Sequence, residues 1–509
     1  MAGKSILIIG AGIAGLSTGV YAQMNGYQSK ILEMHTQAGG LVTAWKRRGY
    51  TIDGCIHWLV GSSSGSGLYR FWKEIGLIEG RQIIDHDIYQ VYEGADGRVF
   101  NQYTNVDRLE KHMLELSPQD AEVIQDFTNG VRFWSKTSPP MGENAGLAGM
   151  LQTAGFMLKI LPRMGDFRKW SKTTMNAYAA RFKDPLLRSA MAEMGEFSVM
   201  TMMMMFAWQN QRVAGYPIGG SLPMIHNVEK RYRDLGGEIQ YGARVEKILV
   251  DANGHAAGVR LANGCELRAD IVVSAADGHA TIFEMLEGRY VDDTIRGYYG
   301  LPTKTPGKFM TLKPFSPIML VGVGVNRDFK DEPCSVAGIN FELREPVVIA
   351  DRPHKRLTAH LYQFDPSMAP AGKTVLTMII ETDYDYWKKL QGSREVYDAK
   401  KSEISETIVD CLEQRWPGIG AQIEMIDVST PLTFERYTGN WRASFEGWQV
   451  TAETGLMQIK KTLPGLEDFY MAGQWVMPGG GLPGGVMTGR QVVGMICKKD
   501  HKKFETSIV

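Results

Sequence analysis

A strand, a glycine-rich turn and a helix follow one another at the start of the chain, and this unit restricts the fold more than any other feature. Residues 5–9 are a short apolar run, typical of a buried parallel strand. Gly10, Gly12 and Gly15 then give G-x-G-x-x-G, in which Gly10 permits a sharp turn and Gly15 lets the helix pack close to the strand. Glu33 ends the next apolar run. Strand, helix and acid stand in the order of a dinucleotide-binding unit, so the sequence predicts a Rossmann-type α/β fold.

The predicted ligand contacts of this unit follow from elementary chemistry. Gly12 has no side chain, so a pyrophosphate can approach its backbone. The free N–H groups at the helix start, where Ile13 and Ala14 stand, favour the negative charge of the phosphates. Glu33, followed by Met34, can accept hydrogen bonds from both hydroxyls of an adenosine ribose and would repel a 2′-phosphate.

Length, charge and cysteine content exclude several classes of protein. A chain of 509 residues predicts two or three domains. Lysine plus arginine and aspartate plus glutamate both number 56, and this balance argues against a nucleic-acid partner. Five scattered cysteines without a C-x-x-C pair predict neither disulfides nor a metal site and favour a reducing compartment. No apolar run reaches the roughly 18–20 residues of a membrane span. We therefore expect a cytoplasmic protein, either free or bound peripherally at the inner face of a membrane.

Residues 139–216 differ from the rest in composition. Aromatic and apolar residues alternate there with lysines and arginines between residues 156 and 172, and a methionine run occupies residues 202–205. Such a basic amphipathic stretch suits either a membrane interface or the solvated helix of a cap domain. The methionine run suits either an adaptable apolar pocket or ordinary core.

The α/β pattern returns in residues 217–290, and residues 300–430 mix strands, expected at 318–325 and 374–381, with a helix expected at 403–415. A glycine-rich stretch at residues 473–485 precedes the last helix, and glycines at this density suit a close approach of backbone to a cofactor. Gly322 and Gly324 fall in an expected strand without a third glycine, so we predict no second dinucleotide site.

Four blocks of sequence resemble those of the phytoene desaturase, carotenoid isomerase and retinol saturase group, within the amine-oxidase-like flavoproteins. They are residues 10–33, 39–59 (GGLVTAWKRRGYTIDGCIHWL), 219–277 (ending in VVSAAD) and 472–489 (AGQWVMPGGGLPGGVMTG). The resemblance implies an FAD-binding domain assembled from discontinuous segments, with an inserted α+β substrate domain. The expected boundaries give the FAD domain residues 1–100, 217–290 and 431–509, and the substrate domain residues 101–216 and 291–430.

The resemblance also implies contacts along the whole cofactor. Gly10, Gly12 and Gly15 would meet the pyrophosphate, and Glu33 the adenosine ribose. The remaining expected contacts are Gly39, Gly40 and Leu41 for the phosphates and ribityl chain, Val245 for the adenine, Ala276 and Asp277 for the adenosine half, and Gly473, Gly480, Gly481 and Leu482 for the flavin end. Leu41 replaces an arginine that is frequent in the superfamily, so flavin contacts of that arginine are not transferred.

The expected chemistry is hydride transfer at flavin N5, paired with proton transfer. It would desaturate, saturate or isomerise double bonds of an apolar isoprenoid, carotenoid, retinoid or related lipid. His57 is the candidate proton donor or charge stabiliser, because histidine titrates near neutrality; a packed core histidine is the other interpretation. The electron partner stays open among NADPH, a quinone and oxygen. An FAD-dependent amine oxidase and a non-catalytic lipid or prenyl carrier on the same fold are the alternative functions.

Overall fold

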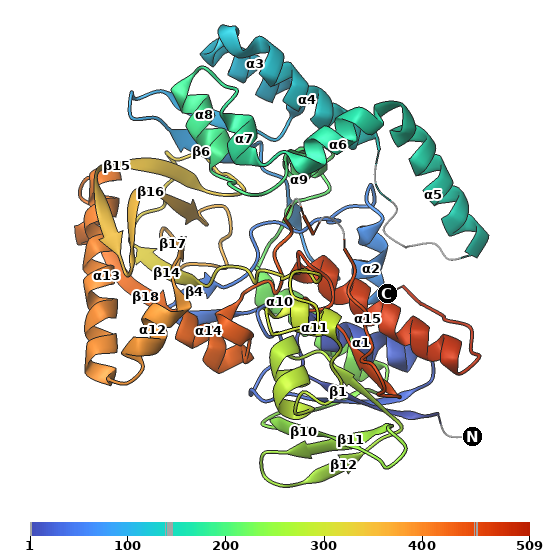
Figure 1. Cartoon of the computed structure of the whole chain (residues 1–509). Helices are drawn as coiled ribbons and strands as arrows, with labels where there is room; N and C mark the ends of the chain where they lie inside the picture. Colours follow the sequence, from blue (N-terminus) through green and yellow to red (C-terminus); the bar gives the residue numbers. More distant parts are fainter. Residues whose placement is uncertain (1–2, 138, 140–145, 452, 455–456, 509) are drawn as a thin grey trace.

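Five parallel strands from three separate parts of the chain form the first sheet (Figure 1). The computed structural model describes residues 3–137, 139, 146–451, 453–454 and 457–508. In spatial order the strands are β19 (Phe469–Met471), β13 (Ile271–Ser274), β1 (Ser5–Ile9), β2 (Gln28–Leu32) and β9 (Glu238–Gln240). In this register Ile8 lies between Val273 and Ile31. The sheet is thus assembled from discontinuous segments, as the sequence predicts.

The two faces of this sheet carry different layers. Ile6 and Ile8 of β1 belong to one apolar cluster with the helices, whereas Leu7 and Ile9 belong to another with the β-meander, as the alternation of strand side chains requires. The helices are α1 (Ile13–Met24), α10 (Ser221–Asp234) and α15 (Gly481–Lys499). The meander consists of β10 (Val245–Val250), β11 (Ala256–Leu261) and β12 (Glu266–Arg268). Helix α1 packs against both α15 and α10, so the first and last parts of the chain meet beside β1.

A seven-stranded mixed sheet forms the second unit. Its spatial order is β18 (Ile423–Ser429), β14 (Ile318–Val325), β17 (Thr374–Glu381), β16 (Arg352–Leu361), β15 (Ile339–Ile349), β6 (Ile88–Glu93) and β7 (Val99–Tyr103). The flanking helices are α12 (Tyr384–Leu390), α13 (Arg394–Arg415) and α14 (Pro431–Thr438). β6 pairs with β15, so the strand pairing assigns residues 88–93 to this unit, whereas the expected boundary at residue 100 assigns them to the first.

In the described part of the chain, seven helices form a cap with its own apolar core. They are α3 (Val106–Leu116), α4 (Ala121–Lys136), α5 (Gly146–Ile160), α6 (Met164–Lys172), α7 (Met175–Ala179), α8 (Pro185–Ala192) and α9 (Val199–Asn210). The shorter elements between the units include β3 (Ala44–Arg47), β4 (Tyr50–Asp53), α2 (Leu68–Glu74), β5 (Ile83–Ile84), β8 (Tyr216–Pro217) and α11 (Asp293–Tyr298). All five cysteines are free thiols. Within the described residues, every helix is too short or too polar to cross a membrane.

Candidate functional site

The glycine turn after β1 leaves open space where a ligand can reach the backbone. Gly12 is the uncapped N-cap of α1, and a Cβ there would have only the Gly39 oxygen near it, at 3.9 Å. The first turn of α1 contains no acidic residue. The backbone of Gly40 passes directly over Gly12. Free N–H groups and the helix dipole at this point favour an anion.

Glu33 is fixed at the end of β2 beside this turn. Its Oε2 accepts a hydrogen bond of 2.6 Å from the Ala11 N–H, and its Oε1 accepts one of 2.8 Å from the His35 N–H. The carboxylate is buried, yet it forms part of a cavity wall together with Met34 and Val245. It is therefore held in place before any ligand arrives.

The closing glycine block brings a second helix N-terminus to the same place. α15 begins at Gly481 behind Gly480, whose φ of 45° belongs to the left-handed region, and no side chain caps this helix. α15 packs along α1, and the first residues of both helices line one cavity. Two uncapped helix starts thus converge on a shared space.

This cavity has a volume of about 1630 Å³ and is lined from all three units. A pocket for one drug-sized ligand measures about 300–1,000 Å³, so the space exceeds the needs of a single small molecule. The predicted site residues on its wall are Gly10, Gly12, Ile13, Ala14, Glu33, Met34, Gly39, Gly40, Leu41, His57, Val245, Ala276, Asp277, Gly473, Gly480, Gly481 and Leu482. Gly15 is not on this wall, because it packs behind the turn, where a Cβ would collide with the Gly10 carbonyl oxygen. The structure therefore supports the packing role of Gly15 and not a ligand contact.

Part of the cavity wall is apolar. This part includes Trp58, Met204, Met205 and Trp208, so α9 contributes to the lining. On the same helix Met203 is buried in the core of the cap. The methionine run therefore serves both as core and as cavity wall.

A buried aspartate fixes the segment that carries His57. Both carboxylate oxygens of Asp53 accept 2.6 Å hydrogen bonds from Ser221 at the start of α10, one from its N–H and one from its hydroxyl. The N–H groups of Cys55 and Ile56 donate to the same carboxylate. Burial raises the pKa of Asp53. The anchored segment presents Cys55, His57 and Trp58 to the cavity.

His57 is a neutral imidazole near pH 7. Burial lowers its pKa to about 4, and its ring lies 4.4 Å from that of His360, centroid to centroid. An imidazolium at this position is therefore disfavoured, which weakens the predicted role of proton donor or charge stabiliser.

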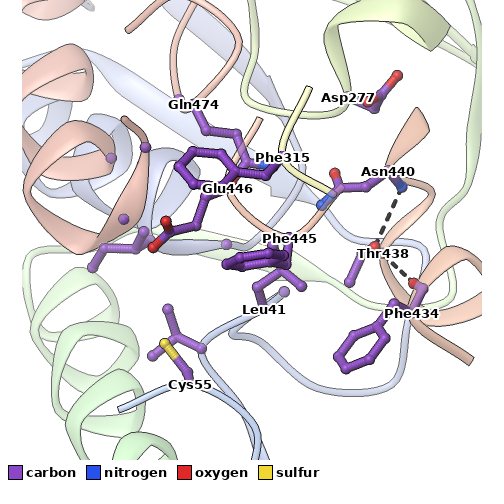
Figure 2. Close-up of a pocket in the computed structure, with 18 of the residues that line it drawn as sticks. Leu41, Cys55, Asp277, Phe315, Phe434, Thr438, Asn440, Phe445, Glu446 and Gln474 are labelled. Carbon is purple, nitrogen blue, oxygen red and sulfur yellow. Dashed lines mark hydrogen bonds between the residues drawn. The ribbon is translucent and has the colours of Figure 1, made fainter. Parts of the chain in front are cut away.

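The structure brings residues to the cavity that no sequence motif marked. They are Phe315, Phe434, Thr438, Asn440, Phe445 and Glu446, and Gln474 joins them from within the closing block at residues 472–489. Figure 2 shows Glu446, Phe445 and Phe315 close together, with Asn440 and Asp277 on the other side of the view. Burial raises the pKa of Glu446 and that of Asp277 to about 7. A lone acid inside the apolar run Phe445–Trp448 was the one available signal for Glu446.

The fold and this site define a Rossmann-type flavoprotein. The open backbone at Gly12, the fixed Glu33 and the two converging helix starts fit FAD. Among the described residues, no group of three or more histidines, cysteines, aspartates or glutamates is placed to hold a metal ion. The family of flavin-containing amine oxidoreductases matches residues 13–308, and the chain belongs to this family. The protein is an FAD-dependent oxidoreductase.

Individual relatives extend the similarity beyond residues 13–308. A phytoene desaturase (neurosporene-forming) of Rhodobacter capsulatus is 25% identical, over 98% of this chain and 95% of that protein. A chloroplastic prolycopene isomerase of Daucus carota is 27% identical, over 52% of this chain and 41% of that protein. The crystal structure of an oxidoreductase from Methanosarcina mazei has a TM-score of 0.57 at 16% identity and covers 96% of this chain and 100% of that one.

Proposed function

We propose that the protein uses FAD to desaturate, saturate or isomerise carbon–carbon double bonds of an apolar polyene of the isoprenoid or carotenoid class. The observation that carries the proposal is one cavity whose wall contains both the glycine turns and an apolar surface of methionines and tryptophans. The glycine turns and Glu33 offer phosphate and ribose contacts, and the wall formed by Trp58 and α9 offers apolar surface. The names of the relatives, which include desaturation and isomerisation of carotenoids, support the same class.

The contacts to FAD are also a proposal. Gly12 and the start of α1 would bind the pyrophosphate, and Glu33 would accept from the adenosine ribose. Val245 would lie at the adenine, and Gly473 with the start of α15 at the flavin. FAD, when bound, supplies the acceptor or donor of a hydride. The protein contributes orientation and apolar walls, among them Phe315 and Phe445, that exclude water from the reacting bond.

We test the proposal by purifying the protein and recording its visible flavin bands. The FAD enzyme is then titrated anaerobically with NADPH and, separately, with phytoene or prolycopene in lipid vesicles. Bleaching by NADPH favours a saturase or a reduced-flavin isomerase, whereas bleaching by phytoene favours a desaturase that passes electrons to a quinone or oxygen. Bleaching by simple primary amines supports the amine oxidase. A protein that binds no FAD after reconstitution contradicts the enzyme function and favours a carrier.

We further propose that α5 and the turn after it contact a membrane. Met150, Leu151, Leu158 and Leu161 are each at least 64% exposed there. The residues of this stretch that face inward, Phe156, Ile160, Phe167 and Trp170, pack on the cap core instead. The exposed cations nearby are Lys159, Arg163, Arg168, Lys169 and Lys172. An apolar face bordered by cations fits an anionic lipid surface.

The position of this surface suits the delivery of an apolar substrate. α6 packs against α9, the helix that contributes to the apolar part of the cavity wall. In co-sedimentation with anionic phospholipid vesicles, the double variant L158D/L161D is expected to lose most of the bound fraction. V348D is the matched control, because Val348 is 63% exposed on β15, on the opposite side of the molecule from α5 (Figure 1). Equal binding of the wild type and L158D/L161D would contradict the proposal.

A further inference from the structure

We propose that Glu446 is the proton-transferring residue of this site and that its carboxyl group exchanges the proton that accompanies hydride transfer. The inference deepens the proposed function and rests on it. Four observations carry it: the place of the carboxyl group, the rigidity of its loop, its lack of a partner, and the state of its neighbours.

The carboxyl group of Glu446 lies at the proposed flavin end of the cavity. Its Oε1 is 3.6 Å from the position that a Cβ of Gly481 would occupy, so it stands at the start of α15. Phe315 and Phe445 lie beside it in Figure 2, and both line the cavity. A substrate bond placed over the flavin would therefore lie close to the Glu446 carboxyl group, with the apolar side chains of Phe315 and Phe445 around it.

The loop that carries Glu446 is held by backbone hydrogen bonds on both sides. The Gly447 carbonyl accepts from the Phe315 N–H at 2.8 Å and from the Ser444 hydroxyl at 2.9 Å. The Gly479 N–H donates to the Trp448 carbonyl at 2.9 Å. Such anchoring fixes the position of the side chain, as a proton-transferring group requires.

Glu446 differs from the other acids on the cavity wall because its side chain is at least half-buried and has no partner. Within the described part of the chain, its carboxyl group has no hydrogen bond or ion pair, and burial is the cause of its raised pKa. The oxygens of Glu33 and Asp277 are occupied by backbone N–H groups, and Glu284 lies 3.7 Å from His279. Glu435 accepts a hydrogen bond of 2.7 Å from the Tyr384 hydroxyl, and Glu246 is exposed to solvent. Glu446 is thus free to exchange a proton with a bound molecule.

The titratable neighbours of Glu446 are less suited than Glu446 to transferring a proton at neutral pH. Cys55, which faces it from the 54–58 segment, has its pKa raised far above the usual range, chiefly by burial. His57 has a pKa of about 4. The pKa of Glu446, at about 7, lies where a group both gives and accepts protons efficiently at neutral pH. The other walls near it, from Phe315, Gln474 and the start of α15, carry no charge.

The step balances in either direction. In desaturation, two neighbouring C–H bonds break and a C=C bond forms. The substrate loses a hydride, with its electron pair, to the flavin and a proton to the Glu446 carboxylate. In saturation, the protonated carboxyl group returns the proton to one carbon while the hydride reaches the other. The substrate is oxidised in the first case and reduced in the second, and the flavin changes by two electrons in the opposite sense.

The test compares E446Q with E284Q, which carries the same change at a cavity acid outside the proposed step. First, infrared difference spectra of the FAD-free proteins are recorded across pH. We expect two carboxyl protonations with midpoints near 7, those of Glu446 and Asp277, in the wild type and in E284Q, and the loss of one of the two in E446Q. An unchanged titration in E446Q would overturn the inference without any use of activity.

Second, flavin reduction or oxidation is followed in single turnovers with the polyene found active above. E446Q is expected to keep its FAD and its flavin spectrum but to react at least about 10²-fold more slowly, without the ionisation near pH 7. Wild-type rates and pH dependence in flavin-loaded E446Q contradict the inference and leave the proposed function standing. Failure of the wild type to bind FAD would contradict the proposed function. The infrared titration of the FAD-free protein would still determine the pKa of Glu446.

Discussion

At the scale of single residues, two glycines three positions apart have different functions. The φ angle of Gly12 is −70°, which any residue can adopt. A Cβ added at Gly12 would extend into the cavity, and the nearest atom to it would be the Gly39 oxygen, at 3.9 Å. A Cβ at Gly15 would strike the Gly10 carbonyl, which belongs to the backbone and has little freedom to move. The missing side chain of Gly12 therefore leaves space for a ligand, whereas that of Gly15 lets α1 pack against the Gly10 carbonyl.

This difference predicts opposite results for two alanine variants. In G12A the free energy of unfolding of the FAD-free protein is expected to change by less than about 0.5 kcal/mol. Its FAD affinity is expected to fall at least tenfold, about 1.4 kcal/mol, because the methyl group occupies the approach of the pyrophosphate. In G15A the unfolding free energy falls by about 1–3 kcal/mol from overpacking. Urea denaturation and flavin titration measure both quantities, and equal stability losses in the two variants would contradict this account.

The buried carboxyl group of Asp277 predicts a pH dependence of stability. Its pKa is raised to about 7 by burial, against an ordinary value of about 3.9. Between these values the folded protein holds a proton that the unfolded chain has released, so the unfolding free energy falls as pH rises from about 4 to about 7.

The variant D277N cannot ionise at this position. Between pH 5 and pH 8 its unfolding free energy is expected to fall less than that of the wild type, by an amount on the order of a few kcal/mol. Denaturant melts of the FAD-free proteins at several pH values measure the difference. The same fall in both proteins would show that Asp277 does not hold its proton.

At the scale of elements, the sequence predicted those strands and helices whose residues form an uninterrupted apolar or amphipathic pattern. β14 is a continuous apolar run and β17 is mostly apolar, and the structure has both with the predicted bounds, Ile318–Val325 and Thr374–Glu381. β15 and β16 were missed because charged residues interrupt their alternation and Pro353 stands inside β16. α13 begins nine residues before the expected helix, because its first turns are mostly exposed. Ser393, which caps it by accepting from the Val396 N–H, was the available signal.

Some residues of the candidate site could also be predicted from local sequence, and others could not. The glycine turns and Glu33 could be predicted because motif and ligand contact lie in one short segment. Phe315 lies just before β14, and Glu446 lies in a loop whose Gly447 carbonyl accepts from the Phe315 N–H, so their placement at the cavity depends on how the two units pack. No periodicity or spacing in the sequence encodes it.

The glycines of β14 show how the units are held together. A Cβ at Gly324 would lie 2.6 Å from the ring of Tyr50 on β4, and Tyr50 is fully buried with its hydroxyl donating to Glu424 at 2.7 Å. G324A is therefore expected to lower the unfolding free energy by about 1–3 kcal/mol. G165A in α6 is the matched control, since nothing lies within 4 Å of its new methyl group and helix propensity favours alanine by up to about 1 kcal/mol. Equal stability of G324A and the wild type in denaturant melts would contradict this packing role.

At the scale of the whole molecule, the cavity is the meeting point of segments far apart in the sequence. The turn after β1, the start of β10 and the start of α15 all line it. A ligand that contacts all three segments holds the two ends of the chain together, and its binding energy stabilises this arrangement. Because FAD would bind the folded protein and not the unfolded chain, it stabilises the fold by mass action.

We therefore expect the melting temperature of the FAD-free protein to rise steadily with added FAD. At 100 times the dissociation constant, the gain corresponds to about 2.7 kcal/mol. ADP is the matched ligand, because it offers the adenosine and pyrophosphate to Glu33 and Gly12 but nothing to the start of α15. At equal concentration ADP should raise the melting temperature less than FAD, and G12A should reduce the effect of both. An ADP effect as large as that of FAD would mean that the closing glycine block does not take part in binding, and the three segments would then have to be joined by packing alone.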